Sequence, residues 1–154
     1  KAVDGKYFAM VTPCMINPTN PLYNVNDVFN GILVHGNTLG NTMYYGAGAG
    51  KLPTASAVVS DIIDCVKHLG KTVFCFWDSE DLKLSSMDDS VKRFFVRVAD
   101  ADFAKAQEVF GKLEVIDAGV SGEKGFFTQA MSEKEFNEKS AQVGQILSRI
   151  RVEE

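Results

Sequence analysis

The sequence predicts an α+β protein in which a mixed α/β segment precedes a ferredoxin-like βαββαβ domain. Three observations support this fold class. Apolar residues repeat at helical spacing directly after a glycine-rich loop at residues 46–50. An acidic, serine-rich stretch then interrupts the apolar pattern between residues 78 and 90. Beyond it, strand and helix patterns follow one another in the order βαββαβ.

The first part of the chain begins with strand patterns. Residues 8–16 predict a strand that Pro13 interrupts, which is typical of an edge strand or a bulge. Residues 28–45 predict a hairpin, and its turn contains Asn37 and Gly40.

An amphipathic helix follows the glycine-rich loop. Pro53 suits its first turn, and Gly70 suits the position just past its end. Its apolar side chains recur every three or four positions: Ala55, Val58, Val59, Ile62, Ile63, Val66 and Leu69. Residues 71–77 then predict a further strand.

The part after the acidic stretch, with a domain boundary near residue 88, has the pattern of four strands and two helices. The strands are predicted over residues 91–98, 114–120, 125–131 and 148–154. The first helix carries Phe103, Ala106, Val109, Phe110 and Leu113. Ser132 and Glu135 form a capping box for the second helix, whose inner side carries Phe136, Val143, Ile146 and Leu147.

The bulk composition argues against two classes of partner. The 154 residues are 45% hydrophobic and 23% charged, with a net charge of −4, and the basic residues are scattered. This pattern favours neither a nucleic acid nor an anionic membrane surface. No apolar run approaches the roughly 20 residues that span a bilayer. We therefore expect no nucleic-acid partner and no membrane partner.

Cysteine usage and the first residue bear on where the protein works. Cys14, Cys65 and Cys75 are odd in number and lack CxxC pairing, and no secretory signal opens the sequence. These features indicate a reducing, cytoplasmic setting. Because the sequence begins with Lys1 rather than Met, we expect a piece of a longer protein.

Few residues have the pattern of a catalytic or metal site. His35 has no carboxylate or cysteine at ligand spacing, and His68 lies at a predicted helix end, where it complements the helix dipole. Asp61 and Asp64 share a helix face, and a solvated face is favoured over a catalytic pair. No zinc, Ser-His-Asp or Cys-His pattern is present. We therefore expect no metal.

The stretch GAGAG at residues 46–50 is the strongest functional signal. Gly46, Gly48 and Gly50 allow positive φ and a close approach of backbone to a ligand. The following helix directs its free N–H groups toward the loop, and Thr54 adds a hydroxyl. The spacing GxGxG matches neither the dinucleotide fingerprint GxGxxG nor a Walker loop. A ligand-binding loop and a tight turn without a ligand are equally compatible with it.

The stretch YYGAGAGKLPTASAVVSDIID, residues 44–64, resembles the segment of homoserine dehydrogenases written GxGAGxxPTAxAVxxDxxD. Residues 8–46 are similar to the strand and hairpin region that precedes this segment in the family. Residues 91–154 resemble the ACT domain that many bacterial members carry. The resemblance implies that residues 1–77 are the C-terminal part of the catalytic domain, that 78–90 are a linker and that the rest is an ACT-like regulatory domain.

The resemblance implies a parent enzyme that interconverts L-homoserine and L-aspartate 4-semialdehyde with NAD(P), on the route to threonine, methionine and isoleucine. The family's catalytic residues precede the matched segment, so the fragment itself is expected to be inactive and to hold no cofactor. The loop of Gly46, Gly48 and Gly50, together with Thr54, is expected to contact the nicotinamide end of the cofactor in the parent. Gly48 is the first choice among them.

The ACT-like part departs from its family in the loop after its first strand. Amino-acid-binding ACT domains have a D.PG.L turn there, whereas this sequence reads VADADFAKAQEVF. Asp100 and Asp102 remain as a possible effector loop. Sensing of an amino acid such as threonine and a purely structural or dimerising role both stay open.

Two other functions are weighed against a piece of an oxidoreductase. One is a non-catalytic module that binds an amino acid or mediates dimerisation. The other is a stand-alone nucleotide-phosphate binder, which is disfavoured because no Gly-Lys-Ser/Thr closes the loop. In either case an interrupted sheet leaves an edge strand and an apolar face uncovered, so we expect a homodimer or a larger assembly.

Overall fold

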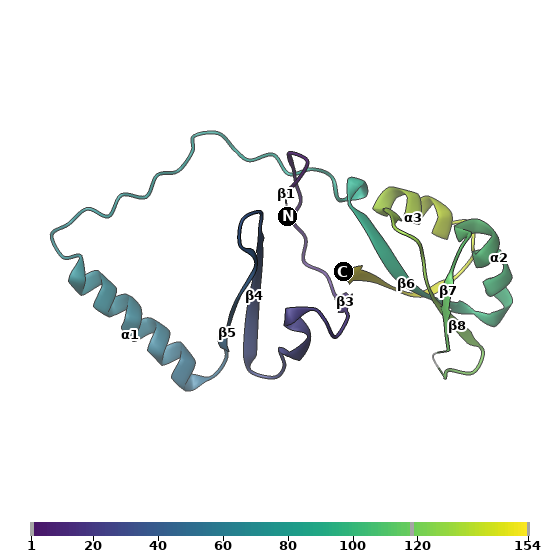
Figure 1. The fold of residues 1–154 in the computed structure, drawn as a ribbon, viewed down its shortest axis with the longest axis horizontal. Coiled ribbons are helices and arrows are strands. Elements are labelled where there is room, and N and C mark those ends of the chain that lie inside the picture. The colour runs from purple at the N-terminus through teal and green to yellow at the C-terminus, as the bar shows by residue number, and fades with distance from the viewer. Residues whose placement is uncertain (1, 118, 154) are drawn as a thin grey trace. The chain divides into compact units, whose positions relative to one another are not determined.

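The computed structural model describes residues 2–117 and 119–153 (Figure 1). Its elements fall into two compact units. One unit contains the residues up to Asn17 together with those from Leu82 onward. The other unit is Pro18–Asp81. The segment before Pro18 therefore groups with the C-terminal part of the chain, although the whole second unit separates the two in sequence.

The first unit is built on a sheet with the strand order β3-β10-β6-β8-β7, and the short β9 also pairs with β6. These strands are β3 (Cys14–Ile16), β6 (Val91–Ala99), β7 (Glu114–Ile116), β8 (Glu123–Phe127), β9 (Met131–Ser132) and β10 (Ile146–Glu153). All neighbours run antiparallel except β3 and β10, which are parallel. β1 (Ala2–Val3) pairs with β2 (Lys6–Tyr7), and the 3₁₀ helix η2 (Met87–Asp89) precedes β6.

Two helices, α2 (Asp100–Phe110) and α3 (Glu133–Ser140), pack on one face of this sheet (Figure 1). Alternate residues of β6 point to that face, as the two-residue period of a strand requires. The ring of Phe136 in α3 lies 4.2 Å from that of Phe94 and 5.4 Å from that of Phe110, centroid to centroid. The core consists of Phe94, Val96, Val98, Ala106, Phe110, Phe126, Met131, Phe136 and Val143.

Most of the elements expected in this unit are present, and the end of α3 is the main exception. The Ser132 hydroxyl accepts a hydrogen bond from the N–H of Glu135 at 3.1 Å, which confirms the predicted N-cap. The helix stops at Ser140, so the prediction that it continues through Val143 to Leu147 is wrong. Val143 lies in a turn and is buried all the same, and Gly144 with φ +104° leads into β10.

The strand predicted over residues 125–131 is divided in the structure. β8 begins earlier, at Glu123, and ends at Phe127, and the separate β9 begins at Met131. Both pair with β6, at different positions along it. The interruption at Thr128 lets its hydroxyl bond to the N–H of Phe94 at 3.1 Å inside the core.

The second unit contains the predicted hairpin. β4 (Phe29–Gly36) and β5 (Gly40–Ala47) pair antiparallel from Phe29 opposite Ala47 to Gly36 opposite Gly40. Gly40 has φ +70°, which explains the glycine at the end of the turn. The 3₁₀ helix η1 (Pro21–Asn24) precedes the hairpin, and α1 (Lys51–Lys67) follows it.

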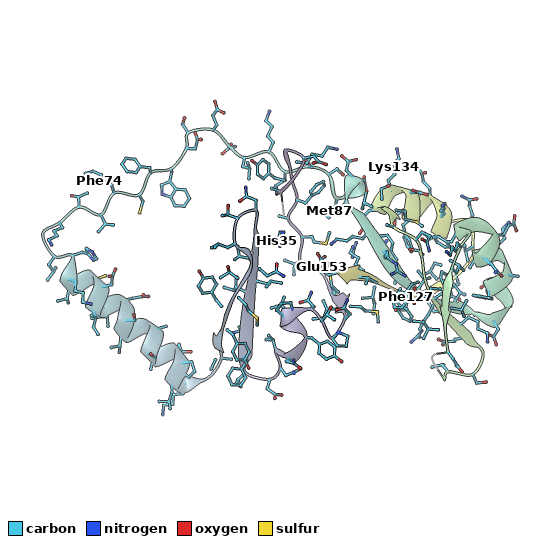
Figure 2. All side chains as sticks on the ribbon, viewed as in Figure 1. His35, Phe74, Met87, Phe127, Lys134 and Glu153 are labelled. Atoms are coloured by element: carbon cyan, nitrogen blue, oxygen red, sulfur yellow. The ribbon has the colours of Figure 1, made fainter. Side chains whose placement is uncertain are left out.

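Two strand predictions are wrong in whole or in part. The pattern over residues 8–16 forms a strand only at β3, after Pro13. Residues 71–78 have no regular secondary structure, so the strand predicted over 71–77 is absent. A strand needs a neighbour for its backbone hydrogen bonds, and no described segment supplies one there. Phe74 and Trp77 are 73% and 90% exposed on this stretch, and Figure 2 shows the position of Phe74.

Candidate functional site

The glycine loop connects β5 to α1 and ends in an open helix start. Gly50 is the N-cap of α1 with φ +113°, a conformation that favours glycine. Among the described residues, no side chain caps this helix, and its first turn holds no acidic residue. The N–H groups of Lys51 and Leu52 are therefore left without helix partners, and Pro53 has none to offer. Such a helix start favours an anion.

The three glycines of the loop have different surroundings. A Cβ at Gly46 would meet no atom within 4 Å. A Cβ at Gly48 would lie 1.6 Å from the Nδ2 atom of the exposed Asn30 side chain, so that side chain would have to move to admit it. The N–H groups of Gly48 and Ala49 donate to the carbonyl of Val28 at 3.2 and 3.4 Å. The loop thus has a glycine with free space around its Cβ position, a glycine that faces the Asn30 side chain, and a glycine with positive φ.

Thr54 belongs to the first turn of α1. Its hydroxyl donates to the carbonyl of Gly50 at 2.9 Å, and its N–H donates to the same oxygen at 3.2 Å. The hydroxyl proton is therefore used inside the turn, and the oxygen keeps its capacity to accept. Thr54 and Gly50 therefore lie in one turn at the start of α1.

The two histidines of this unit have structural partners. The Nδ1 atom of His35 lies 2.7 Å from Oδ1 of Asn41, its cross-strand neighbour. His68 caps the end of α1, where its Nδ1 lies 2.9 Å from the carbonyl oxygen of Asp64. Asp61 and Asp64 are both exposed. Within the described residues, no three His, Cys, Asp or Glu side chains are grouped so that they could hold a metal ion.

Asp100 and Asp102, the possible effector loop, open α2 in the other unit. The N–H of Asp100 donates to the carbonyl of Gly122 at 3.0 Å. Asp102 is half-buried, and a Cβ added at Gly144 would lie 3.3 Å from its Oδ1 atom. Three segments thus meet here: the start of α2, which follows β6 directly, the loop between β7 and β8, and the loop before β10. The arrangement places a carboxylate beside exposed backbone.

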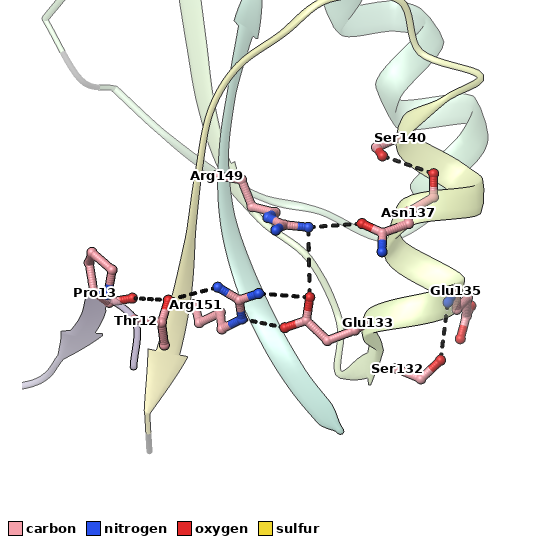
Figure 3. A network of polar contacts seen from close by, with 9 residues as sticks. All are labelled: Thr12, Pro13, Ser132, Glu133, Glu135, Asn137, Ser140, Arg149 and Arg151. Atoms are coloured by element: carbon pink, nitrogen blue, oxygen red, sulfur yellow. Dashed lines mark hydrogen bonds and ion pairs between the residues drawn. The ribbon is translucent and has the colours of Figure 1, made fainter. Parts of the chain in front are cut away.

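A polar network joins α3, β10 and the segment before β3 (Figure 3), and the sequence reasoning missed it. Glu133 is buried, and its carboxylate accepts hydrogen bonds from the Nε and Nη2 atoms of Arg151, the latter at 3.0 Å. Arg149 lies 3.7 Å from the same carboxylate and donates to Asn137 at 2.9 Å. Arg151 also donates to the Thr12 hydroxyl at 2.8 Å. Two arginines spaced by two in a strand share one face, and that spacing was the available signal.

Other described features add no further site. Cys14, Cys65 and Cys75 are exposed and form no disulfide. None of the described helices is both long enough and apolar enough to cross a membrane.

Comparison with known proteins identifies relatives of this chain. A family model described as homoserine dehydrogenase matches residues 2–63. A homoserine dehydrogenase of Pseudomonas aeruginosa is 31% identical over 153 residues, covering 92% of this chain and 33% of that protein. The Bacillus subtilis homoserine dehydrogenase is 36% identical over 129 residues, covering 79% of this chain and 29% of the relative.

The solved structures whose fold is similar to that of this chain include homoserine dehydrogenases as well. A homoserine dehydrogenase from Thiobacillus denitrificans superposes with a TM-score of 0.71 at 26% identity, covering 93% of this chain and 38% of the other. The homoserine dehydrogenase of S. aureus at pH 6.0 gives a TM-score of 0.59 at 26% identity, covering 90% and 36%. The chain therefore spans about a third of the length of these four proteins.

Proposed function

Since the chain belongs to the homoserine dehydrogenase family, we propose that it is the C-terminal part of an NAD(P)-dependent homoserine dehydrogenase. The parent would interconvert L-homoserine and L-aspartate 4-semialdehyde in the cytoplasm, on the route to threonine, methionine and isoleucine. The observation that carries this proposal is the family match over residues 2–63, because that span contains the glycine loop and most of α1.

The residues of the loop fit a dinucleotide cofactor. Gly46 has free space where a side chain would stand, and α1 begins with N–H groups that have no helix partner and, in its described first turn, no acidic residue. When bound, the nicotinamide supplies the position that exchanges a hydride with the alcohol carbon. Gly46, Gly48, Gly50 and Thr54 would line its nicotinamide end and limit access of water. The groups that bind homoserine and move its proton are proposed to lie outside this chain, which alone would be inactive.

Gly46 offers the sharpest test of the loop. It has neither positive φ nor a neighbour within 4 Å, so Gly46→Val should leave the fold intact. In the full-length protein we expect this variant to raise the KM for NAD(P) by about tenfold or more, since each 1.4 kcal/mol of lost binding is tenfold. Gly36→Ala, at the far end of the same hairpin, is the matched control. An unchanged KM for NAD(P) in Gly46→Val would show that Gly46 does not belong to the cofactor site.

We also propose that residues 91–154 form an ACT-like module of the ferredoxin type. The chain order βαββαβ, the strand order β10-β6-β8-β7 and the two helices on one face support this proposal. Asp102 beside the backbone of Gly144 favours a second candidate function, which is binding of an amino-acid effector. The short edge strand β7 is compatible with dimerisation through sheet edges.

One assay addresses both proposals. The full-length protein is tested for homoserine-dependent reduction of NAD⁺ and NADP⁺, with and without millimolar threonine. Turnover that threonine suppresses supports the enzyme and the effector site, and Asp102→Ala should then abolish the suppression. Turnover that threonine leaves unchanged supports the enzyme and a structural or dimerising module, for which light scattering should give a dimer or larger. No turnover with either nucleotide contradicts the proposed function.

A further inference from the structure

Residues 12–16, which we call the strap, lie on the edge of the sheet of the first unit, although in sequence they belong to the part that the family model matches. Within the strap, β3 pairs in parallel with β10, and Met15 lies opposite Val152. The strap therefore covers the edge of β10, which would otherwise carry unpaired backbone groups. The ACT-like module proposed above thus takes an additional strand from the chain before Pro18.

The strap adds no residue to the buried core of this unit. Among the described residues, the nine that form the core lie between Phe94 and Val143. None of residues 4–17 is buried, and Met15 and Ile16 are half-buried. Because local stability follows burial, the strap should open at a lower free energy than the strands β6 and β8.

Backbone pairing and a charged side chain hold the strap on the sheet (Figure 3). The guanidinium of Arg151 donates through Nη1 to the hydroxyl of Thr12 at 2.8 Å. The same hydroxyl donates to the carbonyl of Pro13 at 3.3 Å, so it acts as donor and as acceptor. Thr12 is therefore the side chain through which the strap is fastened to β10.

Arg151 is itself held in place by the rest of the unit. Its Nε and Nη2 atoms donate to the buried carboxylate of Glu133 at the start of α3. The N–H of Glu133 donates to the carbonyl of Ser90 at 3.0 Å, directly before β6. The Nη1 group is thus presented to the strap in a fixed position, and little side-chain entropy is lost when Thr12 accepts from it.

The strap also lies between two fixed points of the chain. Before it, the N–H of Ser85 donates to the carbonyl of Tyr7 at 2.8 Å. After it, the second unit begins at Pro18. When the strap opens, about ten residues connect Tyr7 to Pro18, and such a segment extends over roughly 35 Å. The closed strap instead holds the chain on the sheet as far as Ile16.

We propose that the strap opens and closes on the edge of β10 while the rest of the first unit stays folded, and that the hydrogen bond from Arg151 to Thr12 holds it closed. The closed strap shortens the connection to the second unit, and the open strap lengthens it and exposes the edge of β10. This device is a property of the first unit, and it does not depend on the reaction proposed above.

An integral strand of the sheet would behave differently. Such a strand opens only when the whole unit unfolds, so its amides exchange at the rate of those in β6. A strap exchanges through its own opening, and the loss of the Thr12 hydroxyl then affects the strap alone. Amide hydrogen exchange separates the two cases.

The experiment compares amide exchange in the full-length wild type and in Thr12→Val, which keeps the shape of the side chain and removes the hydroxyl. In the wild type we expect β3 to exchange about tenfold or more faster than β6. Thr12→Val should speed exchange of β3 about a further fivefold or more, since a hydrogen bond to a charged group is lost, and leave β6 and β8 within about twofold. Thr38→Val removes an exposed hydroxyl from the hairpin turn and should match the wild type.

A disulfide tests the strap in the opposite direction. Met15 and Val152 lie opposite each other on adjacent strands, at a separation that a disulfide spans. In the triple variant Cys14→Ser, Met15→Cys and Val152→Cys, oxidation should slow exchange of β3 to about the rate of β6. It should also cancel the effect of Thr12→Val, and reduction should restore that effect.

Faster exchange in β3 alone, reversed by the disulfide, supports the proposal. Equal exchange of β3 and β6 in the wild type overturns it, and so does a Thr12→Val variant that speeds β6 as much as β3, since the strap would then open only with the whole unit. Unchanged exchange of β3 in Thr12→Val overturns the role of Arg151. Cysteines at 15 and 152 that do not join on oxidation contradict the closed position of the strap.

Discussion

The two helices α3 and α1 show how differently one sequence pattern is used in the two units. α3 has eight residues, and it buries Glu133 and Phe136 against the sheet. α1 has seventeen residues with a clear apolar face, and none of them is buried. Val58, Ile62 and Val66 are all more than half exposed. Periodicity tells which face of a helix is suited to burial, but it does not tell what covers that face.

The difference extends to the whole of each unit. The C-terminal strands and helices share one core of nine buried apolar residues, so they stabilise one another. The hairpin and α1 have apolar side chains that lack such cover among the described residues, for example Ile32 at 64% and Tyr44 at 64% exposure. We expect the first unit to be stable within this chain, and the second to depend on the remainder of the full-length enzyme.

The largest effect is expected from the core of the first unit. Phe126 is fully buried between β8 and the helices, with its ring 6.0 Å from that of Phe110. Phe126→Ala should lower the free energy of unfolding by about 3–5 kcal/mol, through lost burial and the cavity that remains. Urea unfolding followed by circular dichroism measures this. Phe76→Ala, at a site that is 92% exposed, is the control, and equal losses in both variants would erase the contrast between the units.

A somewhat smaller effect is expected from the network in Figure 3. Glu133→Ala leaves Arg149 and Arg151 without their carboxylate and removes a negative charge from the first turn of α3. Removing one partner of a buried ion pair should cost about 3 kcal/mol in unfolding free energy. Glu108→Ala, which breaks the exposed pair with Lys105, should change it by less than about 0.5 kcal/mol. A loss for Glu133 no larger than for Glu108 would refute a stabilising network.

The N-cap of α3 should matter less. Ser132→Ala removes the acceptor for the N–H of Glu135 and should lower the unfolding free energy by about 1 kcal/mol. Ser140→Ala, at the other end of the same helix, is the control, because it removes a hydroxyl that donates to the carbonyl of Asn137 and removes no N-cap. The prediction fails if thermal unfolding of the two variants coincides.

The smallest effect in this chain is expected from α1. Ile62→Ala should change the unfolding free energy of the isolated chain by less than about 0.5 kcal/mol, because its side chain is already 57% exposed. In the full-length enzyme the same substitution should cost about 2 kcal/mol or more if the face is covered there. The same small loss in both proteins would show that α1 stays uncovered.

Local signals in the sequence were sufficient to predict the elements that are bounded by a recognisable turn or helix cap. Gly40 identified the hairpin turn, and Ser132 identified the start of α3. The strand expected at Phe74 is absent because a strand is defined by its partner, which local sequence does not reveal. The parallel pairing of Cys14 with Arg151 likewise joins distant segments. For α3, Val143 keeps the apolar helical spacing although the helix has already ended. The spacing therefore predicted that Val143 is buried but not where the helix ends.

The candidate site was recognisable in part. GAGAG and Thr54 were identified because glycine spacing is local, and the structure places Gly50 and Thr54 in one turn. The position of Asn30 beside Gly48 was missed because it depends on the hairpin register. The register follows from the short turn, so a count back from Gly40 could have found it.

Amide hydrogen exchange, measured residue by residue on this chain and on the full-length enzyme, tests the difference between the units most directly. In the chain alone, we expect slow exchange in β6, β8 and β10 and exchange about tenfold or more faster across α1, since local stability follows burial. In the full-length enzyme, α1 should become as protected as β6. Equal protection of α1 and β6 in the chain alone would contradict this account.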